Sequence, residues 1–225
     1  MLNTEDKREY VRVLSVCQDK HILKTLLENL KPGETCWDVG SNIGLYTVLL
    51  AKAVGEKGKV VAFEPEEKSF ERLLQNVELN KLGNVCPFRM ALGQKNEKMQ
   101  LKVHGHYASG AHSLVVSNGS SSNANECESV DVVQGDDLIV KKNLEIPKVI
   151  KIDVEGAEED VLVGLKSTLH DKRCSLVVCE VHFSILASSG RKDVPLKIIQ
   201  YLKDCGFNNL TWLDPSHLAA RKEDN

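Results

Sequence analysis

The fold of this chain is decided by the stretch Thr35-Cys-Trp-Asp-Val-Gly-Ser-Asn-Ile-Gly44. An apolar strand ends near Asp38, two glycines enclose a short loop, and apolar residues then recur at helical spacing from Leu45 to Ala53. Glycine lets such a loop approach a ligand closely, and the N-terminus of the next helix offers unpaired N–H groups. The stretch therefore predicts a strand–loop–helix unit of an α/β domain, with a ligand site at the loop.

The residues of this loop discriminate between classes of nucleotide ligand. A dinucleotide fingerprint, Gly-x-Gly-x-x-Gly, would require glycine where this chain has Asn42, and the Gly-Lys-Ser/Thr ending of a Walker loop is absent. Asp38 would repel a pyrophosphate but suits a ligand with an ammonium group. The loop is thus similar to the first motif of class I methyltransferases, which use S-adenosylmethionine. Taken alone, it fits a plain strand–turn–helix without a ligand equally well.

A second acid follows one helix later. Residues 59–64, Lys-Val-Val-Ala-Phe-Glu, are expected to form the next strand and to end in Glu64. A carboxylate at this point can accept hydrogen bonds from both hydroxyls of a ribose. Dehydrogenases use an acid at the same point, so Glu64 indicates a ribose without identifying the nucleotide. A surface acid preceding Pro65 is the alternative interpretation.

Composition excludes several other classes of protein. The 225 residues are 42% hydrophobic and 27% charged, which fits one soluble domain spanning 1–225. The net charge of −3 and the aromatic content of 5% disfavour a nucleic-acid partner. No apolar run approaches the ~20 residues of a membrane span. The seven dispersed cysteines and the charged N-terminus are typical of a cytoplasmic protein with reduced thiols.

The rest of the chain alternates strand-like and helix-like segments, which predicts an α/β fold with a mostly parallel sheet. Residues 1–32 are expected to be an N-terminal helical segment. The alternation is interrupted at 94–134, where period-two patterns flank a Gly- and Ser-rich stretch, and we expect a small antiparallel insertion there. The other expected elements are helices at 44–54, 67–80, 158–169 and 194–205 and strands at 85–90 and 175–182.

The most specific motif is the stretch Val149-Ile-Lys-Ile-Asp-Val-Glu-Gly-Ala-Glu158. Asp153 ends its apolar strand and is expected in the crevice at the carboxyl edge of the sheet. The acids from Glu158 onward are explained by the helix dipole. Glu180 and His182 are two residues apart in the next strand, so their side chains should share one face at the same edge. A strand-end histidine bonded to the backbone is the alternative for His182.

Together these motifs resemble the FkbM family of methyltransferases, in the order in which that family carries them. The resemblance implies a class I methyltransferase Rossmann-like fold, a mostly parallel seven-stranded sheet with helices on both faces, S-adenosylmethionine as methyl donor and O-methylation of a sugar or natural product. Gly135 departs from the family pattern and indicates an altered turn. The residues that carry the resemblance are 38–44, 63–65, 91–93, 113–114, 150–158 and 180–182.

The resemblance and the strand-end positions together assign roles within the site. The methionine part of the cofactor is expected to contact Asp38 and the loop. The ribose is expected to contact Glu64, and the adenine is expected to lie beside the backbone at Ala91. The cofactor residues are thus Asp38, Gly40, Ser41, Asn42, Gly44, Glu64, Ala91 and Asp153. The expected catalytic residues are Asp153 and Glu155, which position acceptor or donor, and His182, a general base oriented by Glu180. No metal site is expected.

The predicted function is therefore S-adenosylmethionine-dependent methylation, most simply of a hydroxyl on a small-molecule or sugar acceptor. Two alternatives stay open, namely a methyltransferase acting on nitrogen or on a macromolecule, and a non-catalytic protein that only binds S-adenosylmethionine. Base-methylating enzymes often carry an Asn/Asp-Pro-Pro-Tyr/Phe string after this strand, and the sequence after Asp153 does not match it. Acceptor identity and oligomeric state are not predicted.

Overall fold

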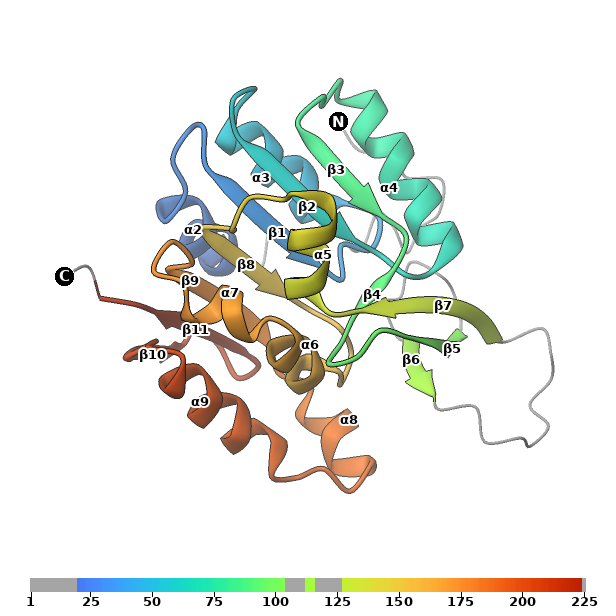
Figure 1. Ribbon diagram of the computed structural model, residues 1–225, viewed down its shortest axis with the longest axis vertical. Coiled ribbons are helices and arrows are strands. Elements are labelled where there is room, and N and C mark those ends of the chain that lie inside the picture. Colours follow the sequence, from blue (N-terminus) through green and yellow to red (C-terminus); the bar gives the residue numbers. More distant parts are fainter. Residues whose placement is uncertain (1–19, 104–111, 116–126, 224–225) are drawn as a thin grey trace.

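The computed structural model describes residues 20–103, 112–115 and 127–223, and its centre is a seven-stranded sheet (Figure 1). The strand order is β10-β11-β9-β8-β1-β2-β3. Five neighbouring strands are parallel, and β11 runs antiparallel to both β9 and β10. The strands are β1 (Thr35–Val39), β2 (Lys59–Phe63), β3 (Val85–Phe88), β8 (Val149–Ile152), β9 (Leu176–Glu180), β10 (Asn209–Trp212) and β11 (His217–Arg221). The expected class of fold is confirmed.

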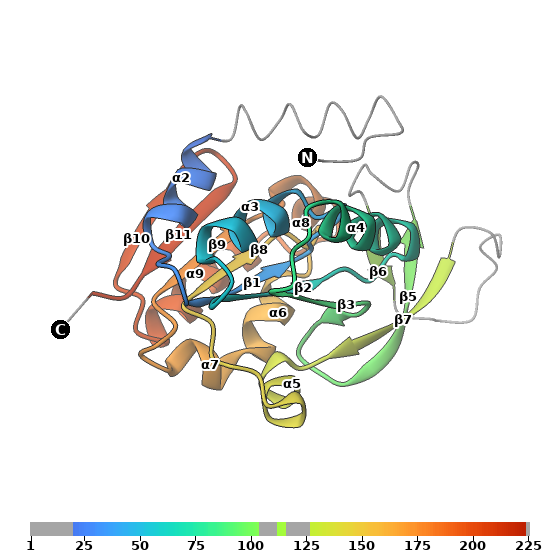
Figure 2. The same ribbon diagram turned by 90° about the horizontal axis from the view of Figure 1, so that it is seen from above.

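Helices cover both faces of this sheet, as Figure 2 shows, with α2, α3 and α4 on one face and α5, α6 and α7 on the other. Successive strand residues alternate between the two layers, so that Cys36 packs into one core and Trp37 into the other. The described helices are α2 (Lys20–Glu28), α3 (Leu45–Val54), α4 (Glu67–Leu79), α5 (Gly135–Lys142), α6 (Glu158–Gly164), α7 (Lys166–His170), α8 (Phe183–Ser188) and α9 (Val194–Asp204). The part of the N-terminal segment before residue 20 lies outside the described residues.

The interruption at 94–134 forms a second, smaller sheet with the order β4-β7-β5-β6. Its strands are β4 (Ala91–Leu92), β5 (Glu97–Val103), β6 (His112–Val115) and β7 (Cys127–Val133). β5 is antiparallel to β6 and β7, as expected, whereas β4 pairs with β7 in parallel. In Figure 1 this sheet lies at the opposite end of the molecule from β10 and α9. No helix among the described residues is long and apolar enough to span a bilayer.

One continuous helix over 158–169 was expected, and this prediction is wrong. The structure has two short helices, α6 and α7, which meet at Leu165. The break is explained by Asp136 at the start of α5, because its carboxylate accepts hydrogen bonds from the backbone N–H groups of Ser167 and Thr168 at 2.6 and 3.0 Å. This is the bonding of a helix N-cap, supplied here by a different helix.

A second correction concerns the strand expected at 175–182. β9 ends at Glu180, and His182 is the N-cap residue of α8. Glu180 and His182 are therefore not an i, i+2 pair on one strand face, although their side chains approach each other.

Gly135, which departs from the family pattern, has a packing reason. A Cβ atom there would lie 2.3 Å from Cδ2 of Leu165.

The contact between α6 and the start of the small sheet yields a stability prediction. A Cβ atom on Gly164 would lie 2.0 Å from the carbonyl oxygen of Gly93. Gly164→Ala should therefore destabilise the protein by about 1–3 kcal/mol through overpacking, although alanine is the better helix former. Gly83→Ala is the control, because nothing lies within 4 Å of the added atom. Urea unfolding of both variants measures the difference, and equal stabilities would refute this packing argument.

Candidate active site

The candidate site lies where the carboxyl ends of β1, β2, β8 and β9 meet, and the loop after β1 lies directly against the end of β8. A Cβ atom on Gly40 would be 1.8 Å from the carbonyl oxygen of Asp153, so only glycine fits there. Gly40 also has a φ of +78°, which favours glycine. The Asp153 N–H donates to the carbonyl oxygen of Val39 at 2.9 Å, so the two loops are fixed to each other.

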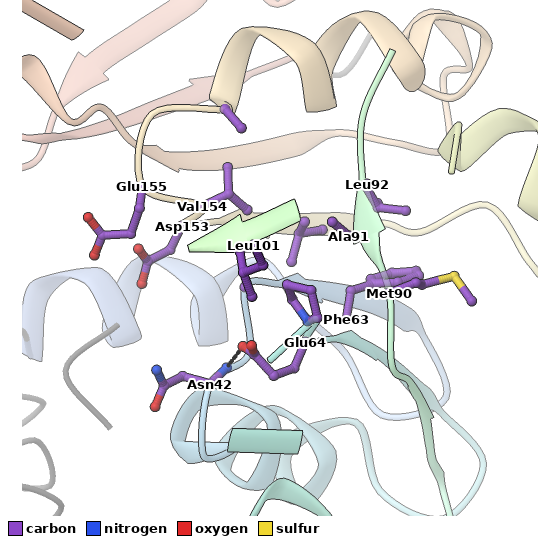
Figure 3. Close-up of a pocket in the computed structure, with 14 residues that line it drawn as sticks. Asn42, Phe63, Glu64, Met90, Ala91, Leu92, Leu101, Asp153, Val154 and Glu155 are labelled. Atoms are coloured by element: carbon purple, nitrogen blue, oxygen red, sulfur yellow. Dashed lines mark hydrogen bonds between the residues drawn. The ribbon is translucent and has the colours of Figure 1, made fainter. Parts of the chain in front are cut away.

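The first pocket at this edge encloses about 640 Å³, part of it open to solvent. Its walls are mostly apolar and come from three parts of the chain, namely the strand ends, β4 and Leu101 of the small sheet. Figure 3 shows the carboxylates of Asp153 and Glu155 at one end of the pocket and Met90 and Leu92 at the other. Ala91, expected beside an adenine, lines the same wall.

Glu64 stands at the floor of this pocket with a fixed orientation. Its side chain is buried, one oxygen accepts the Asn42 N–H at 2.8 Å, and the other accepts the Glu66 N–H at 2.9 Å (Figure 3). Asn42 adopts a φ of +50°, a left-handed conformation that asparagine tolerates better than most residues. The structure thus presents a carboxylate, which is a hydrogen-bond acceptor, in a fixed position on the wall of the pocket.

Asp38 occupies a different place from the one expected for a ligand-binding acid. It is fully buried and does not line the pocket. The Thr47 hydroxyl donates to one of its oxygens at 2.6 Å, and the ammonium of Lys151 lies 3.3 Å from the other. Asp38 therefore contacts α3 and Lys151 from inside the protein, beneath the glycine loop, and does not face the pocket.

Lys151 is a residue of this candidate site that the sequence analysis did not single out. Its ammonium lies between Asp38 and Asp153, 3.4 Å from an Asp153 oxygen, and is almost completely buried. Burial acts to lower the pKa of Lys151, but the charges of Asp38 and Asp153 outweigh it and raise the pKa well above its ordinary value. The available signal was a lysine inside the apolar run 149–152, where a charge needs a partner.

His182 lies among carboxylates from three elements. Nδ1 is 2.6 Å from Oε1 of Glu158, while Nε2 is 3.4 Å from Glu155 and 3.8 Å from both Asp153 and Glu180. Burial acts to lower the pKa of His182, but the hydrogen bond to Glu158 and the facing carboxylates raise it to about 9. Glu158, which the helix dipole alone was expected to explain, is thus the carboxylate that makes the short contact with the ring.

One atom each from Asp153, Glu155 and His182 lies within 4.8 Å of the other two. Two carboxylates and an imidazole are ligands that a divalent cation accepts. Among the described residues, these three side chains form the group that could hold a metal ion at this edge of the sheet.

A second, more polar pocket of about 1050 Å³, part of it open to solvent, adjoins the first and shares Gly40, Asn42, Asp153 and Glu155 with it. Its far wall comes from the turn between β10 and β11, which sequence reasoning did not connect with the site. There Nδ1 of His217 lies 2.9 Å from an Asp214 oxygen, and Nε2 lies 3.3 Å from Glu180. The wall residues are Asp214 and Ser216 of this turn and His217 at the start of β11.

The remaining predicted residues fall into two groups. Ser41 lines the second pocket, and its hydroxyl donates to the Phe63 carbonyl at 3.2 Å. Glu180 lines the second pocket as well. Gly44 is the N-cap residue of α3, where a Cβ atom would meet Leu73 at 2.5 Å, so its role is to pack the loop.

Comparison with known proteins gives a consistent result. The family model for the Methyltransferase FkbM domain matches residues 38–208. The chain is 29% identical over 177 residues to the hexuronic acid methyltransferase AglP of Haloferax volcanii, covering 79% of this chain and 68% of that protein. It is 28% identical over 157 residues to Methyltransferase 1 of Beauveria bassiana, covering 63% of this chain and 62% of that protein.

Solved structures show the same fold at low sequence identity. A Streptococcus mutans protein assigned as a methyltransferase, in complex with SAH, superimposes with a TM-score of 0.55 at 15% identity, covering 92% of this chain and 97% of that one. The precorrin-6y C5,15-methyltransferase of Geobacter metallireducens superimposes with a TM-score of 0.51 at 13% identity, covering 90% of this chain and 88% of that one. These likenesses confirm the class I methyltransferase fold.

The buried ammonium of Lys151 yields a prediction about stability. Lys151→Met should cost about 3–5 kcal/mol, because it leaves the buried carboxylate of Asp38 without its cation. In the double variant with Asp38→Asn the loss should be smaller than the sum of the two single losses, since the two residues interact directly. Urea unfolding of the four proteins measures this coupling.

Lys98→Met is the matched control, because Lys98 pairs with Asp131 at the surface and both side chains are more than half exposed. Its unfolding midpoint should stay close to that of the wild type, since exposed ion pairs contribute little. Strictly additive losses at Lys151 and Asp38 would show that the ion pair does not hold the loop.

Proposed function

This chain belongs to the FkbM family of methyltransferases, and on that basis we propose that it transfers a methyl group from S-adenosylmethionine to a hydroxyl of a sugar or another small molecule. S-adenosylmethionine is the methyl donor of this protein. The observation that carries the proposal is that Asp153 and Glu155 line two adjoining pockets, one largely apolar and one polar. A donor and an acceptor in those pockets would meet at these two carboxylates.

The residues of the first pocket fit the donor. Glu64 would accept hydrogen bonds from the ribose hydroxyls, since its carboxylate lines the pocket and is held in place by two backbone N–H groups. The apolar side chains of Phe63, Met90 and Leu92 would cover the adenine. The requirement for glycine at position 40 agrees with a loop that the donor approaches closely.

The second pocket suits an acceptor rich in hydroxyl groups. Its wall carries carboxylates and an imidazole, which can accept or donate hydrogen bonds to hydroxyls from several directions. The similarity to a hexuronic acid methyltransferase supports a sugar-type acceptor. Loops at strand ends are also where substrate specificity is usually located.

Methyl transfer of this kind is a displacement at carbon. The new oxygen–carbon bond forms as the sulfur–carbon bond breaks, and the sulfur leaves as a neutral thioether. The donor is already activated by its sulfonium, so the chain contributes mainly by holding the acceptor oxygen in line with the methyl group. The acceptor proton must also pass to a base, and we assign that task to the group of Asp153, Glu155, Glu180 and His182.

Glu64→Gln tests the donor site. Hydrogen bonds to a charged acceptor contribute about 1.5–3 kcal/mol each, so the variant should bind S-adenosylmethionine at least about tenfold more weakly in calorimetry. Glu67→Gln is the control, because Glu67 is a half-exposed acid on the next helix and does not line the pocket. Unchanged affinity in Glu64→Gln, or a preference of the wild type for NAD, would contradict this assignment.

Asp153→Asn and His182→Ala test turnover. Each should lower methyl transfer by about 10²–10⁴-fold, the usual contribution of general acid–base groups, while circular dichroism reports an intact fold. The assay combines labelled S-adenosylmethionine with neutral sugars, hexuronic acids, amines, peptides and RNA. Transfer only to amines or RNA would replace the proposed acceptor class, and donor binding without any transfer would indicate a non-catalytic binding protein.

A further inference from the structure

We propose that Asp153, Glu155 and His182 bind a divalent metal ion at the junction of the two pockets. The role of this ion in the reaction rests on the function proposed above, because the ion would hold the acceptor oxygen beside the methyl donor. The existence of the site itself rests only on geometry and charge. Sequence spacing alone indicated no metal site, because its ligands come from two separate loops.

The three donor atoms already converge on one point. Nε2 of His182 lies 3.4 Å from Glu155 and 3.8 Å from Asp153, and all three atoms fall within 4.8 Å of one another. Ligands at about 2.0–2.2 Å from one ion lie roughly 3–4.4 Å from each other. The site therefore needs only side-chain adjustment to accept an ion, and no change of backbone.

Glu158 provides a second and independent observation. It lies outside the three donors, is fully buried, and directs one oxygen to Nδ1 of His182 at 2.6 Å. The same oxygen accepts the Gly156 N–H at 2.8 Å, which fixes its position. When a cation displaces the proton from Nε2, the hydrogen that stays on Nδ1 points to Glu158, and the lone pair of Nε2 faces Asp153 and Glu155. Metal-bound histidines are commonly oriented by a carboxylate in this way.

The other oxygen of Glu158 has no hydrogen-bond partner among the described residues. A buried carboxylate with an unpartnered oxygen is costly unless a positive charge lies near. The His182 ring stands between this carboxylate and the proposed ion, so a bound cation would offset the charge of Glu158 through the ring.

The charge of the surroundings favours a cation at this point. Nε2 of His182 faces the carboxylates of Asp153, Glu155 and Glu180. Lys151 is shared between Asp153 and the buried Asp38 and so offsets only part of this charge. In the described part of the chain, carboxylates thus outnumber the cations at this junction.

Two carboxylates and one imidazole suit a first-row divalent ion such as Mn²⁺ and leave coordination positions open. Because Asp153 and Glu155 line both pockets, an open position would face the acceptor. A bound cation makes a coordinated hydroxyl more acidic. The proton would pass to Glu180, which lines the acceptor pocket and lies beside His217. His182 then serves as a ligand through Nε2.

The test is Mn²⁺ binding to the metal-stripped full chain, followed by calorimetry and by electron paramagnetic resonance. We expect one Mn²⁺ per chain, with affinity at least about tenfold lower in His182→Ala and in Glu155→Gln. Glu158→Gln, which does not touch the ion, should also weaken binding by about 10–100-fold. Asp160→Asn is the control, because this acid lies on the same helix outside the cluster and should leave binding unchanged.

Activity supplies the second readout. Chelation by EDTA should abolish methyl transfer, and added Mn²⁺ should restore it, while S-adenosylmethionine binding persists throughout. Methyl transfer that continues in EDTA, together with absent Mn²⁺ binding, overturns the metal site and leaves the proposed function standing. Mn²⁺ binding that is unaffected by both His182→Ala and Glu155→Gln also overturns it. Mn²⁺ binding that depends on these residues, in a protein that transfers no methyl group, supports the site and removes the proposed function.

Discussion

The buried ammonium of Lys151 is the interaction on which the geometry of the site depends. It lies between Asp38 under the glycine loop and Asp153 at the tip of β8. Two carboxylates this close in an apolar interior repel each other, and a cation between them turns the repulsion into attraction. Gly40 approaches the Asp153 carbonyl so closely that a Cβ atom there would lie 1.8 Å from its oxygen. The Lys151 ammonium and the backbone hydrogen bond from Asp153 to Val39 together connect the two loops that form the shared wall of both pockets.

That shared wall would allow one edge of a sheet to bind the two ligands of the proposed reaction. Asp153 and Glu155 face a pocket with apolar walls on one side and a pocket rich in polar groups on the other. His182 lies against the same carboxylates, and the buried Glu158 fixes the direction of its ring. The side chains proposed to take part in the reaction are thus attached to strand ends and to the N-cap position of α8, and an in-line displacement depends on such fixed positions.

Much of the fold could be predicted from local patterns. The strand–loop–helix at 35–54 and the strands of the insertion follow from hydrophobic periodicity and glycine positions. The split at Leu165 could not be predicted, because the cap of α7 comes from Asp136, some thirty residues earlier in the chain. Lys151 was visible in the sequence as a charge inside an apolar strand, but its partners were not.

The sequence by itself determined which acids stand at the strand tips, because parallel strands joined by helices bring their carboxyl ends to one edge. Glu64, Asp153 and Glu180 follow from that rule. Only the tertiary structure decided that Asp38 supports the loop from below, that Glu158 holds His182, and that the β10–β11 turn brings His217 to Glu180. The reason is physical: side-chain pairing between distant segments depends on ångström-scale separations, which packing sets and periodicity does not encode.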